Sequence, residues 1–156
     1  MNMSGDGLKR SASAGTELFR VKTGTWDQFG SQASAIRFEV FVNEQRVPLE
    51  EELDAADAQC LHALAIDATG DVIGTGRLLP DGHIGRMAVL RPSRGKGAGA
   101  AILLELIEQA RSQGFLQVVL SAQTHAKGFY AKYGFTQEGE EYMDANIAHI
   151  LMRKTL

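Results

Sequence analysis

The sequence predicts one α/β domain built on a mixed sheet, with an antiparallel meander in its first half and a parallel pair of strands at its centre. The meander is predicted by three strand-like runs that short turns separate: Leu61–Ile66, Val72–Leu79 and His83–Leu90. A helical run joins the third of these to the next strand, Gln117–Ala122, and a helical crossover makes neighbouring strands parallel. A length of 156 residues suits a single domain.

The N-terminal elements are predicted from composition and capping. Residues 1–16 are rich in Ser, Gly and Ala and are expected to form a disordered tail, so the folded domain covers residues 17–156. Residues 17–22 alternate as a first strand does. Thr25 and Gln28 have the spacing of a capping box, and the apolar periodicity that follows predicts a helix to about Val42.

An acidic segment, Asn43–Asp57, comes next. Pro48 disfavours a continuous helix across it, because the residue before a proline is pushed out of the helical region. Two interpretations stay open. The segment is either a solvated loop or short helix, or a negatively charged mouth that attracts a cationic amine.

The last elements follow from helical spacing and glycine stops. Ala100–Ala110 places its apolar residues on one helical face, and Gly114 ends that helix. A short helix is expected over residues 124–133, where Gly134 stops it. Two more strands are expected at residues 135–139 and 149–153.

Composition excludes several classes of function. The net charge of −3 predicts no bulk attraction to nucleic acid or to an anionic membrane. The single Cys60 excludes an internal disulfide, fits a reducing compartment and is best explained as a small core thiol. No apolar run approaches the roughly 20 residues of a membrane span, and the N-terminus lacks the apolar segment of a secretory signal. A cytoplasmic protein is therefore expected.

The stretch Arg91–Ala100 has the chemistry of a phosphate cradle between a strand and a helix. Gly95, Gly97 and Gly99 carry no Cβ, so a phosphate can approach the backbone. The first N–H groups of the helix have no intrahelical partner, and the helix dipole favours an anion there. Arg94 and Lys96 add positive charge at the same point.

Spacing separates this loop from two other phosphate loops. A P-loop needs Ser or Thr after its Lys, whereas Lys96 is followed by Gly97. The dinucleotide fingerprint needs a third glycine in another place and an acid at the end of the next strand, where Ser121 stands. A flexible connection without a ligand is the remaining alternative.

Two motifs resemble those of the GNAT superfamily of N-acetyltransferases. Arg94-x-x-Gly97-x-Gly99 resembles its pyrophosphate loop, and Ala126-x-x-Phe129-Tyr130-x-x-x-Gly134-Phe135 resembles the pattern on a later helix. In the first half, a further set of residues resembles the ElaA-like branch of the superfamily: Arg37, Val40, Phe41, Val42, Glu44, Gln45, Pro48, Glu50, Glu52, Asp54, Asp57 and His62. So do Ile84-Gly85-Arg86, Ala122-Gln123-x-His125 and His149.

The resemblance implies a GNAT-like mixed sheet with helices on both faces, and acetyl-coenzyme A as co-substrate. It implies a cofactor site made of the end of one strand, the glycine loop and residues near the second motif: Met87, Ala88, Val89, Arg94, Gly95, Lys96, Gly97, Ala98, Gly99, Gln123 and Tyr130. It implies that Tyr130 is the catalytic general acid, because a phenol can protonate a leaving thiolate. Tyr133 is expected only to pack.

The acceptor site is expected to draw on Glu44, Glu52, Asp54, His125 and His149. Four of these, all except His125, are candidate general bases, and the sequence does not rank them. Residues 145–148 depart from the Gly-Ile-Pro that relatives carry before the histidine. The backbone N–H groups of residues 87–89 are expected to stabilise the charge that develops on the carbonyl oxygen, and direct transfer without a covalent intermediate is expected.

Neither a metal site made by the histidines nor a catalytic role for the strand arginines is expected. His62, His125 and His149 lack the spacing of zinc ligands, so no metal is expected. Arg77 and Arg86 either lie on an exposed strand face or pair internally with the acidic segment.

The function expected is acetyl transfer to a primary amine on a small molecule. A peptide or protein amine and a longer acyl group stay open, as does a module that binds coenzyme A without turnover. No nucleic-acid or membrane partner is expected, and a homodimer is left open.

Overall fold

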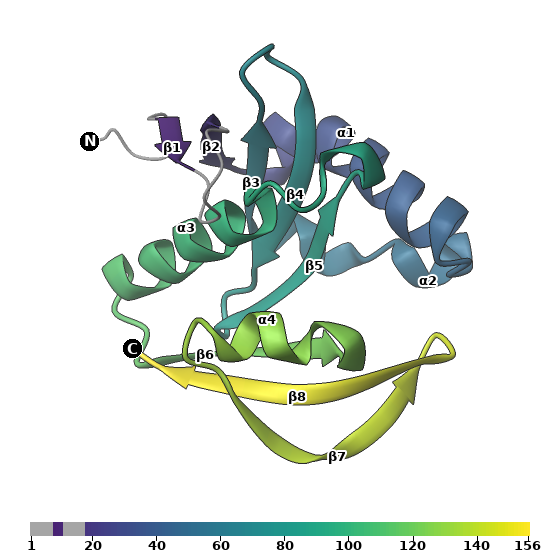
Figure 1. Cartoon of the computed structure of the whole chain (residues 1–156), viewed down its shortest axis with the longest axis vertical. Coiled ribbons are helices and arrows are strands. Elements are labelled where there is room, and N and C mark those ends of the chain that lie inside the picture. Colours follow the sequence, from purple (N-terminus) through teal and green to yellow (C-terminus); the bar gives the residue numbers. More distant parts are fainter. Residues whose placement is uncertain (1–7, 11–17) are drawn as a thin grey trace.

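The computed structural model describes residues 8–10 and 18–156, which form an eight-stranded sheet in the order β1-β2-β3-β4-β5-β6-β8-β7 (Figure 1). The strands are β1 (Leu8–Arg10), β2 (Leu18–Gly24), β3 (Leu61–Ile66), β4 (Val72–Leu78), β5 (His83–Val89), β6 (Gln117–Gln123), β7 (Thr136–Asp144) and β8 (Ile147–Thr155). Only β5 and β6 pair in parallel among these strands, and all other neighbours are antiparallel. The predicted meander and parallel pair are confirmed.

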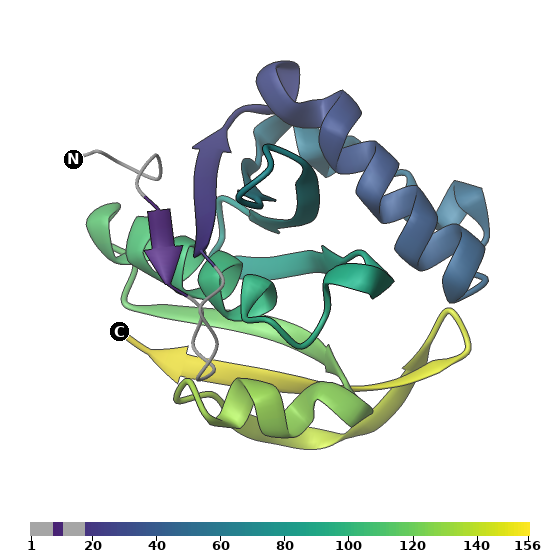
Figure 2. The same ribbon diagram turned by 45° about the horizontal axis from the view of Figure 1, so that its top comes forward.

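Helices cover both faces of this sheet (Figure 2). The helical elements are α1 (Trp26–Arg37), the π-helical η1 (Phe38–Glu44), α2 (Leu49–Glu52), the 3₁₀ turns η2 (Ala55–Gln59), η3 (Arg91–Ser93) and η4 (Thr124–Ala126), α3 (Ala98–Ser112) and α4 (Lys127–Ala131). The α1–η1 unit lies on one face, and α3 and α4 lie on the other. Among the described residues, no helix combines the length and the apolar character that a membrane span requires.

The structure corrects several predicted boundaries. Leu8–Arg10 pairs with β2 as a strand, although it falls in the expected tail; the rest of that tail lies outside the described residues. The helix expected to run from Thr25 to about Val42 is α-helical only to Arg37 and then widens into η1. Its predicted capping box is confirmed, with Gln28 N–H donating to Thr25 Oγ1 at 3.3 Å and Thr25 N–H donating to Gln28 Oε1 at 2.8 Å.

The last two strands are longer than predicted because a two-residue turn joins them. Ala145 and Asn146 have φ values of 51° and 63°, which is the backbone of a tight hairpin. Every residue of β7 is exposed, so the polar sequence of this edge strand hides the strand pattern. The hairpin projects beyond the sheet and borders the site described below (Figure 1).

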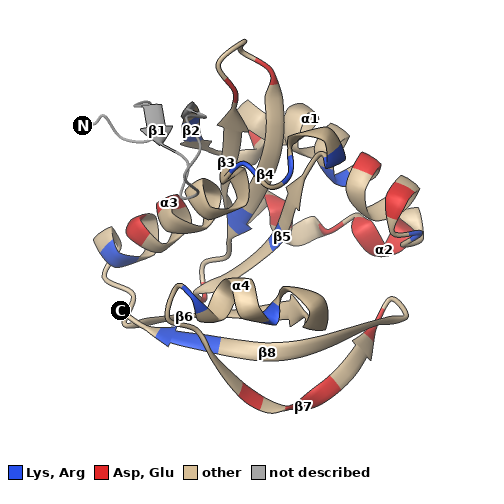
Figure 3. Cartoon of the chain, viewed as in Figure 1, with Lys and Arg blue, Asp and Glu red and all other residues tan. Residues whose placement is uncertain are grey.

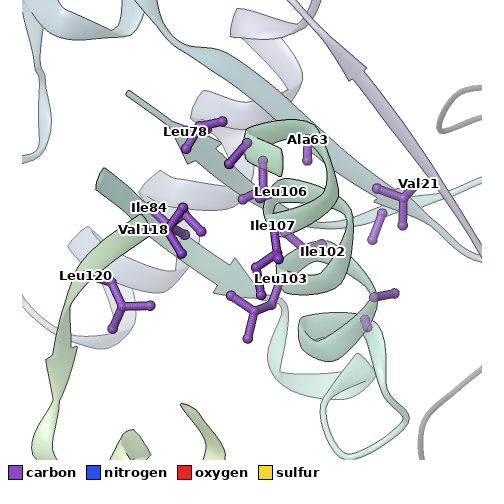
Figure 4. Packing of buried hydrophobic residues seen from close by; sticks show 14 of the residues in the cluster. Val21, Ala63, Leu78, Ile84, Ile102, Leu103, Leu106, Ile107, Val118 and Leu120 are labelled. Atoms are coloured by element: carbon purple, nitrogen blue, oxygen red, sulfur yellow. The ribbon is translucent and has the colours of Figure 1, made fainter. Parts of the chain in front are cut away.

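Helix α3 forms the core by packing along the sheet. Its residues Ile102, Leu103 and Leu106 are fully buried and lie against apolar side chains of the strands (Figure 4). Two strand glycines, Gly74 and Gly76, make this close approach possible. A Cβ on Gly76 would come within 2.7 Å of Met87 Sδ and 2.8 Å of Ile102 Cγ2.

Gly76→Ala is therefore expected to lower the free energy of unfolding by about 1–3 kcal/mol, because the added methyl overpacks the helix–sheet contact. Urea denaturation measures the change. Gly85→Ala is the matched control, because a Cβ there meets no atom within 4 Å. Equal losses in the two variants would show that steric contact with α3 is not the cause.

A bulge in β5 opens the sheet. Thr75 pairs with Ala88 and Arg77 with Gly85, so Gly76 faces both Arg86 and Met87. Arg86 has a φ of 49°, in the left-handed region. Beyond Ile84 and Leu120, β5 no longer pairs with β6, whereas β6 stays paired with β8 as far as Gln123. The two central strands thus diverge after a short parallel stretch, as Figure 1 shows.

Candidate active site

The diverging strands open into a cleft of about 750 Å³. Residues 85–89 of β5 form one wall, and residues 120, 121 and 123 of β6 form the other. Residues of η1 and the β7–β8 turn close the sides, and Tyr130 of α4 lies at the base. A cleft of this size suits a small-molecule ligand. The N–H and C=O groups of β5 that face away from β4 have no strand partner beyond Ile84, so an extended ligand can pair with them.

The glycine loop begins α3 at the end of β5. Gly97 has a φ of 97° and caps the helix without a side chain, so the chain turns sharply into α3. The N–H of Ala101 donates to the carbonyl of Gly97, which leaves the earlier first-turn N–H groups free of intrahelical partners. A Cβ on Gly99 would meet only Phe129 and Val89, at 3.8 and 3.9 Å. This geometry fits a phosphate held by backbone amides.

Arg94 does not offer an unpaired charge to this loop. Its two Nη atoms donate to the carboxylate of Glu44 at 2.6 and 2.7 Å, and its Nε donates to the Val89 carbonyl at 2.8 Å. Arg94 therefore fastens the loop to η1 and to the end of β5. Lys96 is exposed and has no ion pair within the described chain, so its charge remains available.

Glu44 is correspondingly a poor general base. Hydrogen bonds from Arg94, and to a smaller extent from Arg91, lower the pKa of Glu44 to about 2. Burial acts in the opposite direction but is outweighed. A carboxylate with this pKa has little affinity for a proton at neutral pH.

The acidic segment turns inward instead of forming an open negative mouth. Asp57 is buried and accepts hydrogen bonds from Arg37 at 2.9 and 3.0 Å and from Arg77 at 2.7 Å. Glu52 accepts a hydrogen bond from Arg37, and Asp54 accepts one from Arg77 at 2.7 Å. The predicted alternative of internal pairing for Arg77 is confirmed. Figure 3 shows the acidic residues that remain at the surface on α2 and along β7.

Tyr130 lies between apolar rings at the base of the cleft. Its ring contacts Phe129 and Phe135, with centroids 5.1 and 5.9 Å apart. Burial raises the pKa of Tyr130 to about 12, so the phenol keeps its proton at neutral pH. Tyr133 packs against Phe129 at 5.4 Å, as predicted.

His149 lines the cleft from β8, next to Gln123 at the end of β6, and a backbone hydrogen bond identifies which of its ring nitrogens is the donor. Its Nδ1 lies 2.7 Å from the carbonyl oxygen of Ile147, so Nδ1 is the donor of this hydrogen bond, and in the neutral ring Nε2 carries the lone pair. The ring is buried, lines the cleft and stacks on Tyr142 with centroids 6.0 Å apart. The Tyr142 hydroxyl in turn hydrogen-bonds Ser121. This arrangement can accept a proton from a group in the cleft.

A glutamine pair connects the end of η1 with the end of β6. Gln45 and Gln123 hydrogen-bond through their amides at 2.9 Å, and His125 Nε2 lies 2.7 Å from Gln123 Oε1. The structure thus brings Gln123, His125 and His149 to one cleft, as the resemblance implies. It places Glu52 and Asp54 in the ionic cluster with Arg37 and Arg77, where Glu52 lines the cleft and Asp54 lies beside it.

One group of possible metal ligands, Asp57, Cys60 and His62, does not fit a metal ion. Asp57 is fully engaged by two arginines, and His62 Nε2 lies 2.9 Å from the Asp57 carbonyl oxygen. Burial, the largest influence, raises the pKa of the Cys60 thiol. Cys60 donates to the Ala56 carbonyl at 3.2 Å, so it is a core thiol as predicted.

Sequence reasoning missed Ser121 and Asp144 as cleft residues, and it missed Tyr142 as the ring that stacks on His149. Tyr142 and Asp144 lie on the exposed strand β7, whose sequence gives no periodic signal, and the hairpin brings Asp144 to the cleft and Tyr142 to His149. The alternation of Ser121 with buried neighbours in β6 was the one available sign.

The splayed sheet, the amide-rich helix start and the cleft together define an N-acyltransferase fold. Residues 27–156 match the family model described as acetyltransferase (GNAT) domain, so the chain belongs to this family, whose general reaction is acetyl transfer from acetyl-coenzyme A. It is 39% identical over 123 residues to the uncharacterized N-acetyltransferase YjcF of Bacillus subtilis (strain 168), covering 76% of this chain and 87% of that protein.

Two solved structures are similar over almost the whole domain. An acyl-CoA N-acyltransferase from Pseudomonas aeruginosa has a TM-score of 0.78 at 29% identity, covering 88% of this chain and 99% of that one. Escherichia coli ElaA also has a TM-score of 0.78, at 25% identity, covering 86% of this chain and 99% of that one. The predicted fold class and family are confirmed.

Proposed function

We propose that the chain transfers an acetyl group from acetyl-coenzyme A to a primary amine by direct attack within a ternary complex. The observation that carries this proposal is the cleft at the divergence of β5 and β6, which reaches from the glycine loop to Tyr130 and His149. The first-turn amides of α3, with Lys96, would hold the pyrophosphate. Residues 87–89 would pair with the extended pantetheine arm.

His149 is the general base in this proposal. Of the four candidates, Glu44 is held by Arg94, and Glu52 and Asp54 are paired with Arg37 and Arg77. The carboxylate of each of the other three candidates is thus paired with an arginine, whereas His149 Nε2 makes no hydrogen bond within the described chain. It would remove a proton from the acceptor ammonium, directly or through water.

Tyr130 is the general acid. While the amine attacks, backbone N–H groups of residues 87–89 would stabilise the negative charge that develops on the carbonyl oxygen. Tyr130 would then give its proton to the departing thiolate. Cys60 is buried beneath η2 and does not line the cleft, which supports direct transfer without an acyl-enzyme.

Thiol release from acetyl-coenzyme A in the presence of an amine panel tests the proposed reaction. Release that depends on an added amine, with the acetylated amine identified by mass spectrometry, supports it. Full retention of coenzyme A without turnover of any small amine or lysine peptide would favour a binding module instead.

Gly99→Val tests the phosphate cradle. The folded chain has room for a Cβ there, so the variant is expected to fold and to lose coenzyme A affinity by about 10- to 100-fold, because the side chain occupies space beside the phosphate. Calorimetry measures the affinity. Ala35→Val, at an exposed position of α1, is the matched control. Unchanged affinity in Gly99→Val would contradict the cradle. Gly97 is less suitable, because its positive φ strains any side chain.

A further inference from the structure

Arg86 holds an unusual position in the cleft wall. It lies at the bulge of β5 with a φ of 49°, a backbone conformation that is strained for a residue other than glycine. Its side chain lines the cleft and is 28% exposed. The strained backbone is therefore part of what places this guanidinium in the site.

The guanidinium of Arg86 is poorly satisfied. Only Nη2 donates hydrogen bonds, to the backbone carbonyls of Glu52 at 3.2 Å and Glu51 at 3.5 Å. Nε is buried and has no hydrogen-bond partner, and Nη1 makes no hydrogen bond within the described chain. A charged group with unused donors beside a cleft is a natural place for an anionic ligand.

The neighbouring carboxylates are already used. Arg37 and Arg77 take both oxygens of Asp57, and each binds one further carboxylate, Glu52 or Asp54. Arg86 only approaches the same two groups, with its Nη2 3.6 Å from Asp54 Oδ2 and its Nε 3.8 Å from Glu52 Oε1. Burial, followed by the charges of Arg77 and Arg37, lowers the pKa of Arg86, and Glu52 and Asp54 oppose this only in part.

The charge balance selects the ligand class. Three arginines, Arg37, Arg77 and Arg86, stand beside three carboxylates, Glu52, Asp54 and Asp57, so the cluster is neutral as a whole. A ligand with one carboxylate and one ammonium leaves it neutral, whereas a phosphorylated amine adds net negative charge. Glu51 and Asp144 also line the cleft and suit an ammonium group.

We infer that the acceptor is an amine that carries its own carboxylate, as a free amino acid does, and that Arg86 binds this carboxylate through Nη1, the unused donor that is not buried. The inference rests on the function proposed above. It makes Arg86 a specificity-determining residue, which orients the amine toward His149 and the thioester.

The test compares glycine, alanine, methionine, phenylalanine and glutamate with their carboxamides, and with O-phosphoethanolamine. Both kcat/KM for thiol release and calorimetric binding to the coenzyme A complex are measured. At least one amino acid is expected to exceed its amide by about 10- to 100-fold, the value of a charged hydrogen-bonded contact. Arg86→Gln should remove this preference by lowering kcat/KM for the amino acid, while kcat/KM for the amide stays within about twofold of its value in the unaltered chain. Arg86→Lys should restore part of it.

Arg111→Gln, on the outer face of α3, is the matched control and should keep the preference. An unchanged affinity for coenzyme A shows that each variant is folded. If an Arg86 variant loses that affinity, Arg86→Gly is tested in its place, because glycine adopts the positive φ at this position without strain. Equal use of acids and amides by the unaltered chain would overturn the inference while the acetyltransferase function stands. The inference would also be overturned if Arg86→Gln lowered kcat/KM equally for amino acids and their carboxamides, or if the unaltered chain preferred O-phosphoethanolamine to the amino acids. If no amine turns over, equal binding of acids and amides overturns it independently.

Discussion

Replacing Tyr130 with Phe should lower kcat by about 10²- to 10⁴-fold, the usual contribution of a general acid. The substitution removes one hydroxyl and keeps the ring that packs between Phe129 and Phe135. Stability and coenzyme A affinity should therefore change little. Steady-state kinetics and calorimetry together separate the two effects. Tyr133→Phe, which removes a hydroxyl from the same helical region, is the matched control.

The pH profile gives this prediction a second readout. Because burial raises the pKa of Tyr130 to about 12, the folded protein keeps the phenolic proton more tightly than the unfolded chain does. The proton donor is thus present throughout neutral and mildly alkaline pH, and its loss should limit kcat only as the pH approaches 12. A fall in kcat near pH 9 that disappears in Tyr130→Phe would show that the phenol titrates normally. A loss of coenzyme A affinity in the variant would assign Tyr130 to binding.

Replacing Asp57 with Ala should lower the free energy of unfolding by about 3–5 kcal/mol, because it leaves two buried guanidinium groups without their shared carboxylate. Arg37 and Arg77 are only 2% and 6% exposed, so water cannot replace the missing partner. Urea denaturation followed by circular dichroism measures the loss. Asp71→Ala, in the exposed turn between β3 and β4, is the control and should cost much less.

The same carboxylate predicts acid sensitivity. Burial, the largest influence, would raise the pKa of Asp57, but hydrogen bonds from Arg37 and Arg77 outweigh it and hold the pKa below the ordinary value of 3.8. The unfolded chain therefore takes up this proton first as the pH falls. The contribution of Asp57 to stability should be complete above about pH 4 and should be lost progressively below it. If the free energy of unfolding of Asp57→Ala depended on pH between 5 and 2 in the same way as that of the unaltered chain, this role of Asp57 would be contradicted.

The loop and the order of elements were predictable because their signals are local. Gly97 needs a positive φ that only a few residues adopt easily, and the helix after it follows from apolar spacing within the same stretch. The parallel pairing of β5 and β6 follows from the helix between them. Tyr130 was found because it lies in a short motif on one helix.

The partners of the charged residues were not predictable in this way. Glu44 and Arg94 are 50 positions apart, and Asp57 lies 20 positions from each of the two arginines it binds. The spacing of residues in the sequence does not indicate which side chains from distant segments come into contact in the fold. Both interpretations of the acidic segment consequently stayed open, and all four candidate bases remained equal until the fold paired three of them with arginines.

The sequence by itself determined the family, the mixed sheet and the glycine-rich turn into α3, because each depends on residues close together in the chain. The tertiary structure alone decided three other features. Arg94 is bound to Glu44 and to the Val89 carbonyl, His149 Nε2 makes no hydrogen bond within the described chain, and Arg86 has hydrogen-bond donors without partners. Those three outcomes depend on the bulge and divergence of β5, where the distance between side chains from separate elements sets which charges are neutralised and which remain for a ligand.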